Sequence, residues 1–162
     1  MNAVVRTDKM FATDNRAGLV SVRYQPSNTM TAIDNGNVVK IDALEEGSRE
    51  VYKCVTPAAT DKINDIVLIA SPELMYDEHK HNLDDFQNAA GAIARGYRLH
   101  AGDIFSVTKE ALTGTPAIGK TVELAASTKL NVASASATGT AVGTIIDINV
   151  VGRYTYYVIQ VA

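Results

Sequence analysis

The charged stretch 77–81, Asp-Glu-His-Lys-His, contains the residue types most suited to metal chemistry, and two further aspartates follow it closely. Imidazole and carboxylate groups are common ligands of divalent metals. His79 and His81 would face the same side only on a strand, whereas the pattern that follows them is helical. The spacing therefore favours a solvated charged loop. A metal-dependent hydrolase that uses Asp77, His79 and His81 is kept as an alternative.

Three other features suggest chemistry but have simpler structural explanations. His100 stands alone before a turn, with no assignable Ser or Cys partner. Cys54, the single cysteine, lies in a strand-like run and is expected to be a small buried apolar residue. The stretch 139–144, Gly-Thr-Ala-Val-Gly-Thr, lacks the Lys and the following helix of a phosphate-binding loop, so its glycines indicate a bulge or a barrel corner. We expect no enzymatic activity, no metal and no cofactor.

Composition narrows the class of protein. The chain has 162 residues, of which 46% are hydrophobic and 20% are charged, as in an ordinary folded domain. A formal net charge of -3 argues against direct binding to nucleic acid, because phosphate contacts need clustered Lys and Arg. No run of 18 apolar residues occurs, and the residues after Met1 do not resemble a signal peptide, so we expect a cytoplasmic, non-membrane protein.

Short apolar or alternating runs, separated by Gly, Thr, Ser and Asn turns, occur along most of the chain. Their spacing of about 8 to 12 residues predicts a mainly β fold, a small barrel or sandwich. Residues 38–41 follow the Asp-Asn-Gly-Asn turn as a strand and form a hairpin if residues 30–33 are its first arm, and residues 97–99 and 104–107 would form another. Further strands are expected at 20–24, 49–55, 66–70, 121–124 and 130–132.

The last strand has apolar or aromatic residues on both faces. Residues 144–151 and 154–161 can form a hairpin that turns at Gly152-Arg153. One face of the second strand would present Tyr154, Tyr156 and Val158, and the other Tyr157, Ile159 and Val161. Such a strand needs cover on both sides, either within a barrel or sandwich or at a subunit contact.

One short helix, or an ordered loop, is expected near residues 83–95. Apolar residues there are spaced three or four apart, and Asn82 with Asp85 resembles an N-terminal capping pair. Gly91 within the segment lowers its helix propensity by about 1 kcal/mol relative to Ala, so an ordered loop remains open. This segment belongs to a β-rich body over residues 33–162.

Residues 1–32 contain isolated apolar residues in polar surroundings, which suits an extended N-terminal arm. Such a segment cannot form a core alone, so it packs either on a neighbouring subunit or on its own domain. Tyrosines of the last strand are also suited to interfaces that are apolar at one end and wet at the other. The candidate capsid or subunit contacts are Val4, Val5, Met10, Phe11, Val20, Val22, Tyr154 and Tyr156.

Five stretches carry a family resemblance: 34–36, Asp-Asn-Gly; 49–53, Arg-Glu-Val-Tyr-Lys; 70–78, Ala-Ser-Pro-Glu-Leu-Met-Tyr-Asp-Glu; 82–86, Asn-Leu-Asp-Asp-Phe; and 102–107, Gly-Asp-Ile-Phe-Ser-Val. Together, over about residues 30–162, they resemble the decoration or cement proteins of tailed-bacteriophage capsids. The resemblance rests on overall pattern and has no catalytic signature. Residues 76–95 are an insertion relative to the simplest members.

The resemblance implies a virion structural protein on the outer surface of an icosahedral capsid. It implies a β-rich body, an arm that reaches into capsid subunits, and a homo-oligomer, with a trimer favoured. The expected partner is the major capsid protein, and the expected locations are the virion surface and, during assembly, the host cytoplasm. A fibre or adhesin-type surface-binding module is the alternative outside this class.

Overall fold

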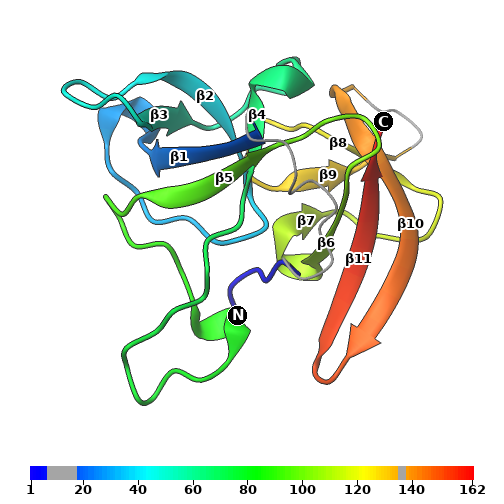
Figure 1. The fold of residues 1–162 in the computed structure, drawn as a ribbon. Helices are drawn as coiled ribbons and strands as arrows, with labels where there is room; N and C mark the ends of the chain where they lie inside the picture. The colour runs from blue at the N-terminus through cyan, green and yellow to red at the C-terminus, as the bar shows by residue number, and fades with distance from the viewer. Residues whose placement is uncertain (7–17, 135–137) are drawn as a thin grey trace.

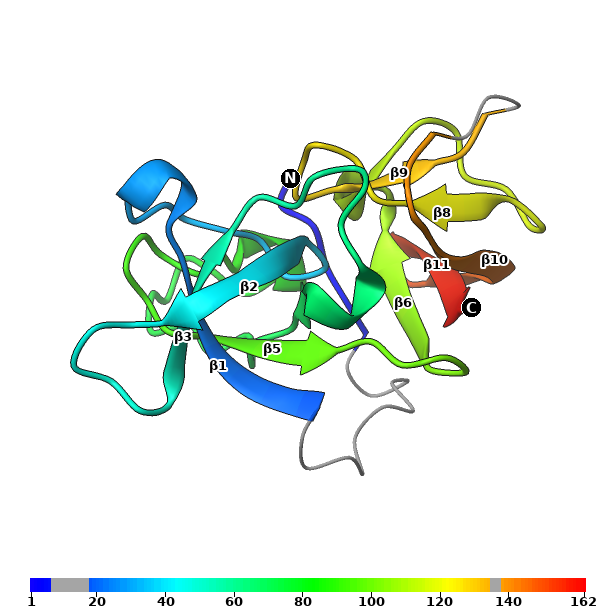
Figure 2. The same cartoon turned by 90° about the horizontal axis from the view of Figure 1, so that it is seen from above.

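The computed structural model describes residues 1–6, 18–134 and 138–162, and within them the chain is mainly β. The strands form a closed barrel and a six-stranded sheet, which lie side by side in Figures 1 and 2. The predicted fold class, a small barrel or sandwich, is confirmed. The strands are β1 (Leu19–Tyr24), β2 (Val38–Leu44), β3 (Val51–Val55), β4 (Ile66–Ile69), β5 (Ala94–Arg98), β6 (Ile104–Thr108), β7 (Leu112–Thr113), β8 (Thr121–Glu123), β9 (Leu130–Val132), β10 (Ala141–Val151) and β11 (Tyr154–Val161).

Helical structure in the described residues consists of short 3₁₀ turns. These are η3 (Pro26–Asn28), η4 (Ile63–Asp65), η5 (Leu83–Asp85) and η6 (Lys109–Ala111). In the part of the chain that the structure describes, no helix is both long and apolar enough to cross a membrane. The arrangement of the molecule is therefore set by its strands.

The barrel contains the first five strands in the order β1-β3-β2-β4-β5, and β5 pairs with β1 to close it. β1 and β3 run parallel, and the other neighbours run antiparallel. The interior is narrow: a Cβ added at Gly96 would lie 3.2 Å from Val67, so only glycine fits there without a shift. The buried side chains inside the barrel are Val22, Ile33, Val39, Cys54, Val67, Ile69 and Ala94.

The second sheet has the order β6-β11-β10-β8-β9-β7. β10 and β11 form the hairpin expected at Gly152-Arg153. The register of β10 against β8 shifts between Ala141 and Gly143, which confirms the predicted bulge. Gly143 is required at this bend, because a Cβ there would lie 2.1 Å from the carbonyl oxygen of Gln160.

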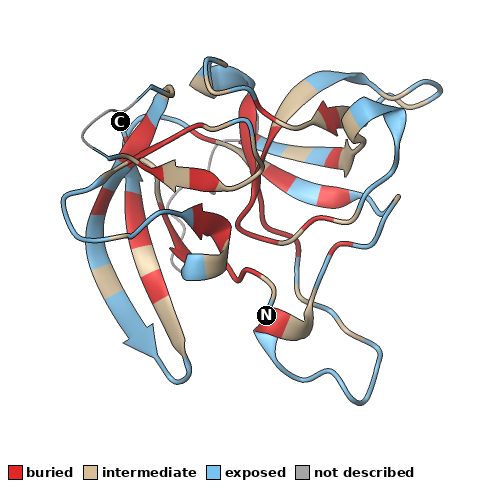
Figure 3. Cartoon of the chain, turned by 180° about the vertical axis from the view of Figure 1, so that it is seen from behind, coloured by how far each residue is buried: buried red, intermediate tan, exposed pale blue. Residues whose placement is uncertain are grey.

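A larger core lies between the barrel and the sheet, and β4 contributes to both cores. Ile66 and Leu68 face the sheet, whereas Val67 and Ile69 face the barrel interior, and all four are fully buried. A strand covered on both faces has no polar side to alternate, which explains the continuous apolar run at this position. Figure 3 shows the buried residues concentrated where barrel and sheet meet.

β11 is covered on both faces, as its sequence predicted. It lies between β6 and β10, with Ile159 and Val161 in the core between barrel and sheet. On the opposite face, Tyr156 is 2% exposed and Val158 is 8% exposed. The cover on this second face comes from the chain itself.

Two predicted hairpins are wrong. Ile33 forms an isolated bridge with Asn88, and β2 pairs instead with β3 and β4. The expected turn is present, with Gly36 at φ +83°, but the strand that follows it enters the barrel between β3 and β4. β5 and β6 belong to different sheets, and Leu99, in the connection between them, is buried in the larger core.

The helix considered for residues 83–95 is wrong, and an ordered loop is present. Only η5 is helical there, with the predicted capping box between Asn82 and Asp85. Gly91 adopts φ +80°, a left-handed conformation that an α-helix does not tolerate, and β5 begins at Ala94. Residues 70–93 therefore form one long connection between β4 and β5, referred to below as the crossing loop.

Of the two packing alternatives for residues 1–32, the described parts show packing on the chain's own domain, so the separate arm is corrected. Residues 19–24 are β1, an integral barrel strand whose Val22 is 0% exposed. Residues 4–6 lie along the edge of β6, with Val4 and Val5 buried. Apolar side chains that were too sparse for a core of their own complete the core of the body. Residues 7–17 lie outside the described part of the chain.

Candidate binding surface

The crossing loop is joined to the tip of the β10–β11 hairpin by one carboxylate. Asp84 in η5 has a side chain only 6% exposed, and it accepts hydrogen bonds of 2.6 Å from Arg153 Nη2 and from the Tyr154 hydroxyl. Hydrogen bonds to an ionised group are stronger than those between neutral groups. Burial, followed by the hydrogen bond to Asp84, raises the pKa of Tyr154, so the phenol remains a donor. These contacts hold the loop against the hairpin.

Buried asparagines hold the two ends of the crossing loop. The Asn35 side chain donates to Ser71 O at 2.8 Å and accepts from Ser71 N at 3.0 Å. At the other end, Asn88 Nδ2 donates to Ile33 O at 3.0 Å and to Asn35 Oδ1 at 3.1 Å. Because a buried amide requires partners, these bonds favour a single loop conformation.

The N-terminal segment adds a further layer beside the hairpin. Thr108 N donates to Val4 O at 2.9 Å, and Arg6 N donates to Ser106 O at 3.0 Å. The Arg6 guanidinium lies over the Tyr156 ring, 5.4 Å from its centroid. Tyr156 is thereby covered from the side opposite the core.

A cleft of about 550 Å³ lies between the crossing loop, the N-terminal segment and the hairpin tip. Leu83 at 40% exposure and Val151 at 46% form its apolar rim. The Arg153 guanidinium lies 5.3 Å from the centroid of the Tyr154 ring. This surface is called the hairpin cleft; its lining residues are Val5, Arg6, Glu73, Leu83, Val151, Gly152, Arg153, Tyr154 and Tyr156.

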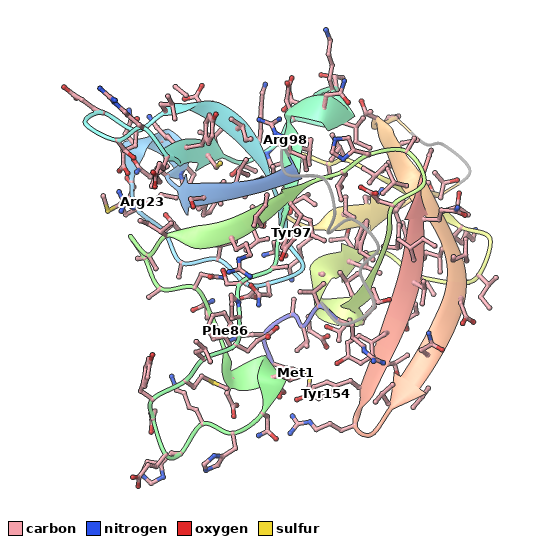
Figure 4. The ribbon with its side chains drawn as sticks, in the orientation of Figure 1. Met1, Arg23, Phe86, Tyr97, Arg98 and Tyr154 are labelled. Atoms are coloured by element: carbon pink, nitrogen blue, oxygen red, sulfur yellow. The ribbon has the colours of Figure 1, made fainter. Side chains whose placement is uncertain are left out.

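Figure 4 shows Met1 and Tyr154 close together between the crossing loop and the hairpin, and both line a smaller adjoining pocket of about 240 Å³. Met1 is 74% exposed. Tyrosine, arginine and methionine are enriched at protein interfaces, where their large side chains combine apolar area with a few directed polar contacts. The hairpin cleft and Met1 therefore have the composition of a protein-binding surface.

A second hollow of about 570 Å³ lies where the crossing loop passes beside β1 and β5. Leu19, Leu74 and Ile93 line it and are 49%, 69% and 54% exposed. Exposed large apolar side chains gathered around one hollow mark interaction surfaces more often than singly scattered ones do. This second hollow is called the barrel groove.

The structure separates the residues that the sequence offered as contacts. Val4, Val5, Val22 and Tyr156 are each 2% exposed or less, so their side chains pack within the protein, and Val5 and Tyr156 also line the hairpin cleft. Their role as external contacts stays a prediction. Their apolar groups are used in the protein's own cores. Tyr154 remains half-buried at the hairpin cleft, and Val20 is half-buried at the barrel groove. Met10 and Phe11 lie outside the described residues.

The candidate metal ligands occupy an exposed part of the crossing loop. Asp77 Oδ1 accepts from His79 N at 3.0 Å, and Asp85 Oδ2 accepts from His81 N at 3.2 Å, so both carboxylates stabilise local turns. Within residues 1–6, 18–134 and 138–162, no group of three or more His, Cys, Asp or Glu side chains is arranged to hold a metal ion. The structure does not bring these residues together as a site.

Cys54 is buried inside the barrel, as its alternation with neighbouring residues predicted. Burial is the main cause that raises the pKa of its thiol to about 12. His100 lies at a turn, where its backbone N donates to Asp103 Oδ2 at 2.7 Å. The burial of Cys54 and the turn position of His100 both indicate a structural role.

Sequence reasoning found Val5, Val20, Tyr154 and Tyr156 but missed the other residues that build the two hollows. Asp84 and Arg153 are 69 positions apart, and nothing local indicates that they pair. Leu74 and Leu83, apolar residues within a charged loop, were the available signal of an exposed surface.

Comparisons of the chain with protein-family models, curated proteins and solved structures gave no match.

Proposed function

We propose that the protein is a structural protein of a tailed-bacteriophage virion that binds the outer surface of the capsid and stabilises the shell. The observation that carries the proposal is the hairpin cleft, where the exposed Leu83 and Val151 lie beside the half-buried Tyr154 on a conformation fixed by Asp84. The choice of the capsid as partner follows from the resemblance at the five stretches described above.

Shell stabilisation requires no chemical step. A protein that binds the assembled lattice and not the separated subunits shifts the equilibrium toward the lattice by mass action. Many copies on one shell make a modest contact effective. The major capsid protein would supply the surface that the cleft contacts, and the protein would be found on the virion and, during assembly, in the host cytoplasm.

The proposal assigns no catalytic residue and no cofactor. Its support is the structural use of the most reactive side chains: Cys54 is fully buried, and Asp84 is engaged by Arg153 and Tyr154. A preformed surface with an apolar rim suits binding, because little conformational entropy is lost when the contact forms.

Sedimentation of capsids with added protein tests the proposal. The full chain is mixed with purified capsids that lack it, and we expect it to pellet with them and to raise the temperature at which the shells open. Leu83→Ser removes one of the two apolar side chains at the rim of the cleft and should weaken binding. Ile118→Ser is the control, since Ile118 is 61% exposed and does not line the cleft.

Two results would contradict this function. One is full-chain protein that stays in the supernatant at all concentrations while a capsid-protein control pellets. The other is recovery of the protein only in the tail fraction of disrupted virions, which would favour the fibre or adhesin alternative.

A further inference from the structure

Over about half of its length, β10 has one edge without a strand partner among the described residues, called the open edge. β8 pairs with β10 only at Ala141, Gly143 and Thr144, and the backbone contacts of that edge continue to Ile145 through Gly119 and Lys120. From Ile146 to Val151, no described strand pairs with the edge of β10 that faces away from β11. Figure 1 shows β10 at the outer side of the sheet, with its end at the hairpin tip well beyond β8.

The register of the hairpin determines which backbone groups face this edge. Val151 and Tyr154 flank the two-residue turn and face each other across the ladder. Neighbouring residues of an antiparallel strand direct their N–H and C=O groups to opposite sides. The backbone groups of Val151 and Asn149 therefore face β11, and those of Ile148 and Val150 face the open edge.

After the bulge at Ile145 to Asp147, this edge has few of the usual protections against pairing with another chain. Natural edge strands carry Lys, Pro, several charges or bulges, or are very short. Residues 146–151 read Ile-Asp-Ile-Asn-Val-Val, with Asp147 as the only charge. Val150 is 73% exposed and Ile146 is 40% exposed, and Figure 3 shows most of this part of β10 as exposed.

The order of side chains in this segment matches a second copy of itself. In an antiparallel pair centred on Asn149, Ile148 faces Val150 of the second copy, and Asp147 faces Val151 of the second copy. No like charges oppose each other, and apolar side chains meet directly, which stabilises cross-strand pairs. Each pair of Ile148 and Val150 would exchange two N–H···O bonds.

The bulge in β10 disfavours registers centred nearer the start of the strand. A pair centred one residue earlier would require Ile146, which lies where the β10–β11 register shifts between Ile145 and Asp147. Centred on Asn149, the pair uses only the regular part of the strand. We propose that the open edge of β10 pairs antiparallel, around a two-fold axis at Asn149, with the same edge of a second copy and joins two six-stranded sheets into one.

Disulfide trapping of the full chain tests the register. Asn149→Cys places two thiols directly opposite each other, at a Cα separation of roughly 4.5–5.5 Å that a disulfide can span. We expect a covalent dimer on mild oxidation. Val151→Cys is the matched control, because its two copies would lie four residues apart and should not crosslink. Cys54 does not interfere, since it is 0% exposed.

Sedimentation equilibrium of the free chain tests the association itself. We expect a reversible dimer, and Val150→Lys should raise its dissociation constant about tenfold or more, because a charge would replace the apolar contact at the edge. Gln160→Lys adds the same charge on the inner strand β11, where residue 160 is exposed, and should leave the dimer unchanged.

A chain that stays monomeric at millimolar concentration, or crosslinking of Val151→Cys in place of Asn149→Cys, would overturn the proposal. So would a trimer, the form that the resemblance favours, since a three-fold axis cannot place one edge against itself. Hydrogen exchange that protects Ile148 and Val150 only after capsids are added would assign the edge to the capsid protein. These experiments use the free chain, so their failure is distinct from failure to bind capsids.

Discussion

Removing the Asp84 carboxylate should release the crossing loop from the hairpin tip. In Asp84→Ala, Arg153 and Tyr154 both lose their acceptor. A hydrogen bond to a charged group contributes about 1.5–3 kcal/mol when its partners are buried. The Arg153 side chain is 50% exposed, so water replaces most of its bond and its share falls below about 1 kcal/mol. The expected loss of unfolding free energy is about 2 kcal/mol.

For a chain of this size, about 2 kcal/mol corresponds to a decrease of roughly 4–8 °C in Tm. Calorimetry and urea unfolding should both report it. Tyr154→Phe removes one of the two bonds, and in a double-mutant cycle with Asp84→Ala the two changes should couple by about 1 kcal/mol. Trypsin should also cleave faster at the exposed Lys80 in Asp84→Ala, because the loop would open locally.

Asp77→Ala is the matched control for Asp84→Ala. Asp77 lies in the same loop but is exposed and accepts only the His79 backbone N, so its loss should change stability by less than about 0.5 kcal/mol. If Asp84→Ala is as stable as Asp77→Ala and equally resistant to trypsin, Asp84 does not hold the loop to the hairpin.

Three further predictions concern the core, the thiol and the pH dependence. Ile159→Ala, at 0% exposure, should lower the unfolding free energy by about 2–5 kcal/mol in urea titrations, whereas Val150→Ala at 73% exposure should change it little; equal effects would contradict the core assignment. Iodoacetamide should leave Cys54 unmodified in the native protein and modify it in urea, and rapid native modification would contradict its burial. The pKa of Asp85 is lowered, chiefly because the backbone N–H of Asn82 donates a hydrogen bond to its carboxylate. The contribution of Asp85 to stability is therefore present above the unfolded pKa of 3.8 and is lost as pH falls through the folded value. Stability of Asp85→Asn should therefore fall less on acidification to pH 2 than that of the parent, and an equal fall in both would contradict this.

Much of the strand content follows from local patterns. The turn at Gly152-Arg153, the alternation in residues 154–161 and the apolar run beginning at Ile66 each predicted an element that the structure contains. Turn residues and the two-residue period of side chains act within a few positions of the chain. The capping pair Asn82 and Asp85 is correct for the same reason, although the helix that it was expected to begin ends after one turn.

The binding surface was less accessible to prediction. Val5, Val20, Tyr154 and Tyr156 line hollows, but Val4, Val5, Val22 and Tyr156 are almost fully buried within the protein. A sequence shows that such residues are apolar, but it does not show which surface covers them. Exposure of Leu74, Leu83 and Ile93 depends likewise on the course of the crossing loop.

The amino-acid sequence by itself determined that this chain is a β protein, where most of its strands lie and where its C-terminal hairpin turns. Tertiary structure alone decided that β5 and β6 enter different sheets, that residues 4–6 extend the sheet at β6, and that Asp84 reaches Arg153. The physical reason is distance along the chain. Strand position is set by local periodicity. Strand partners and long-range ion pairs depend instead on how distant parts of the chain come together and on which faces become covered.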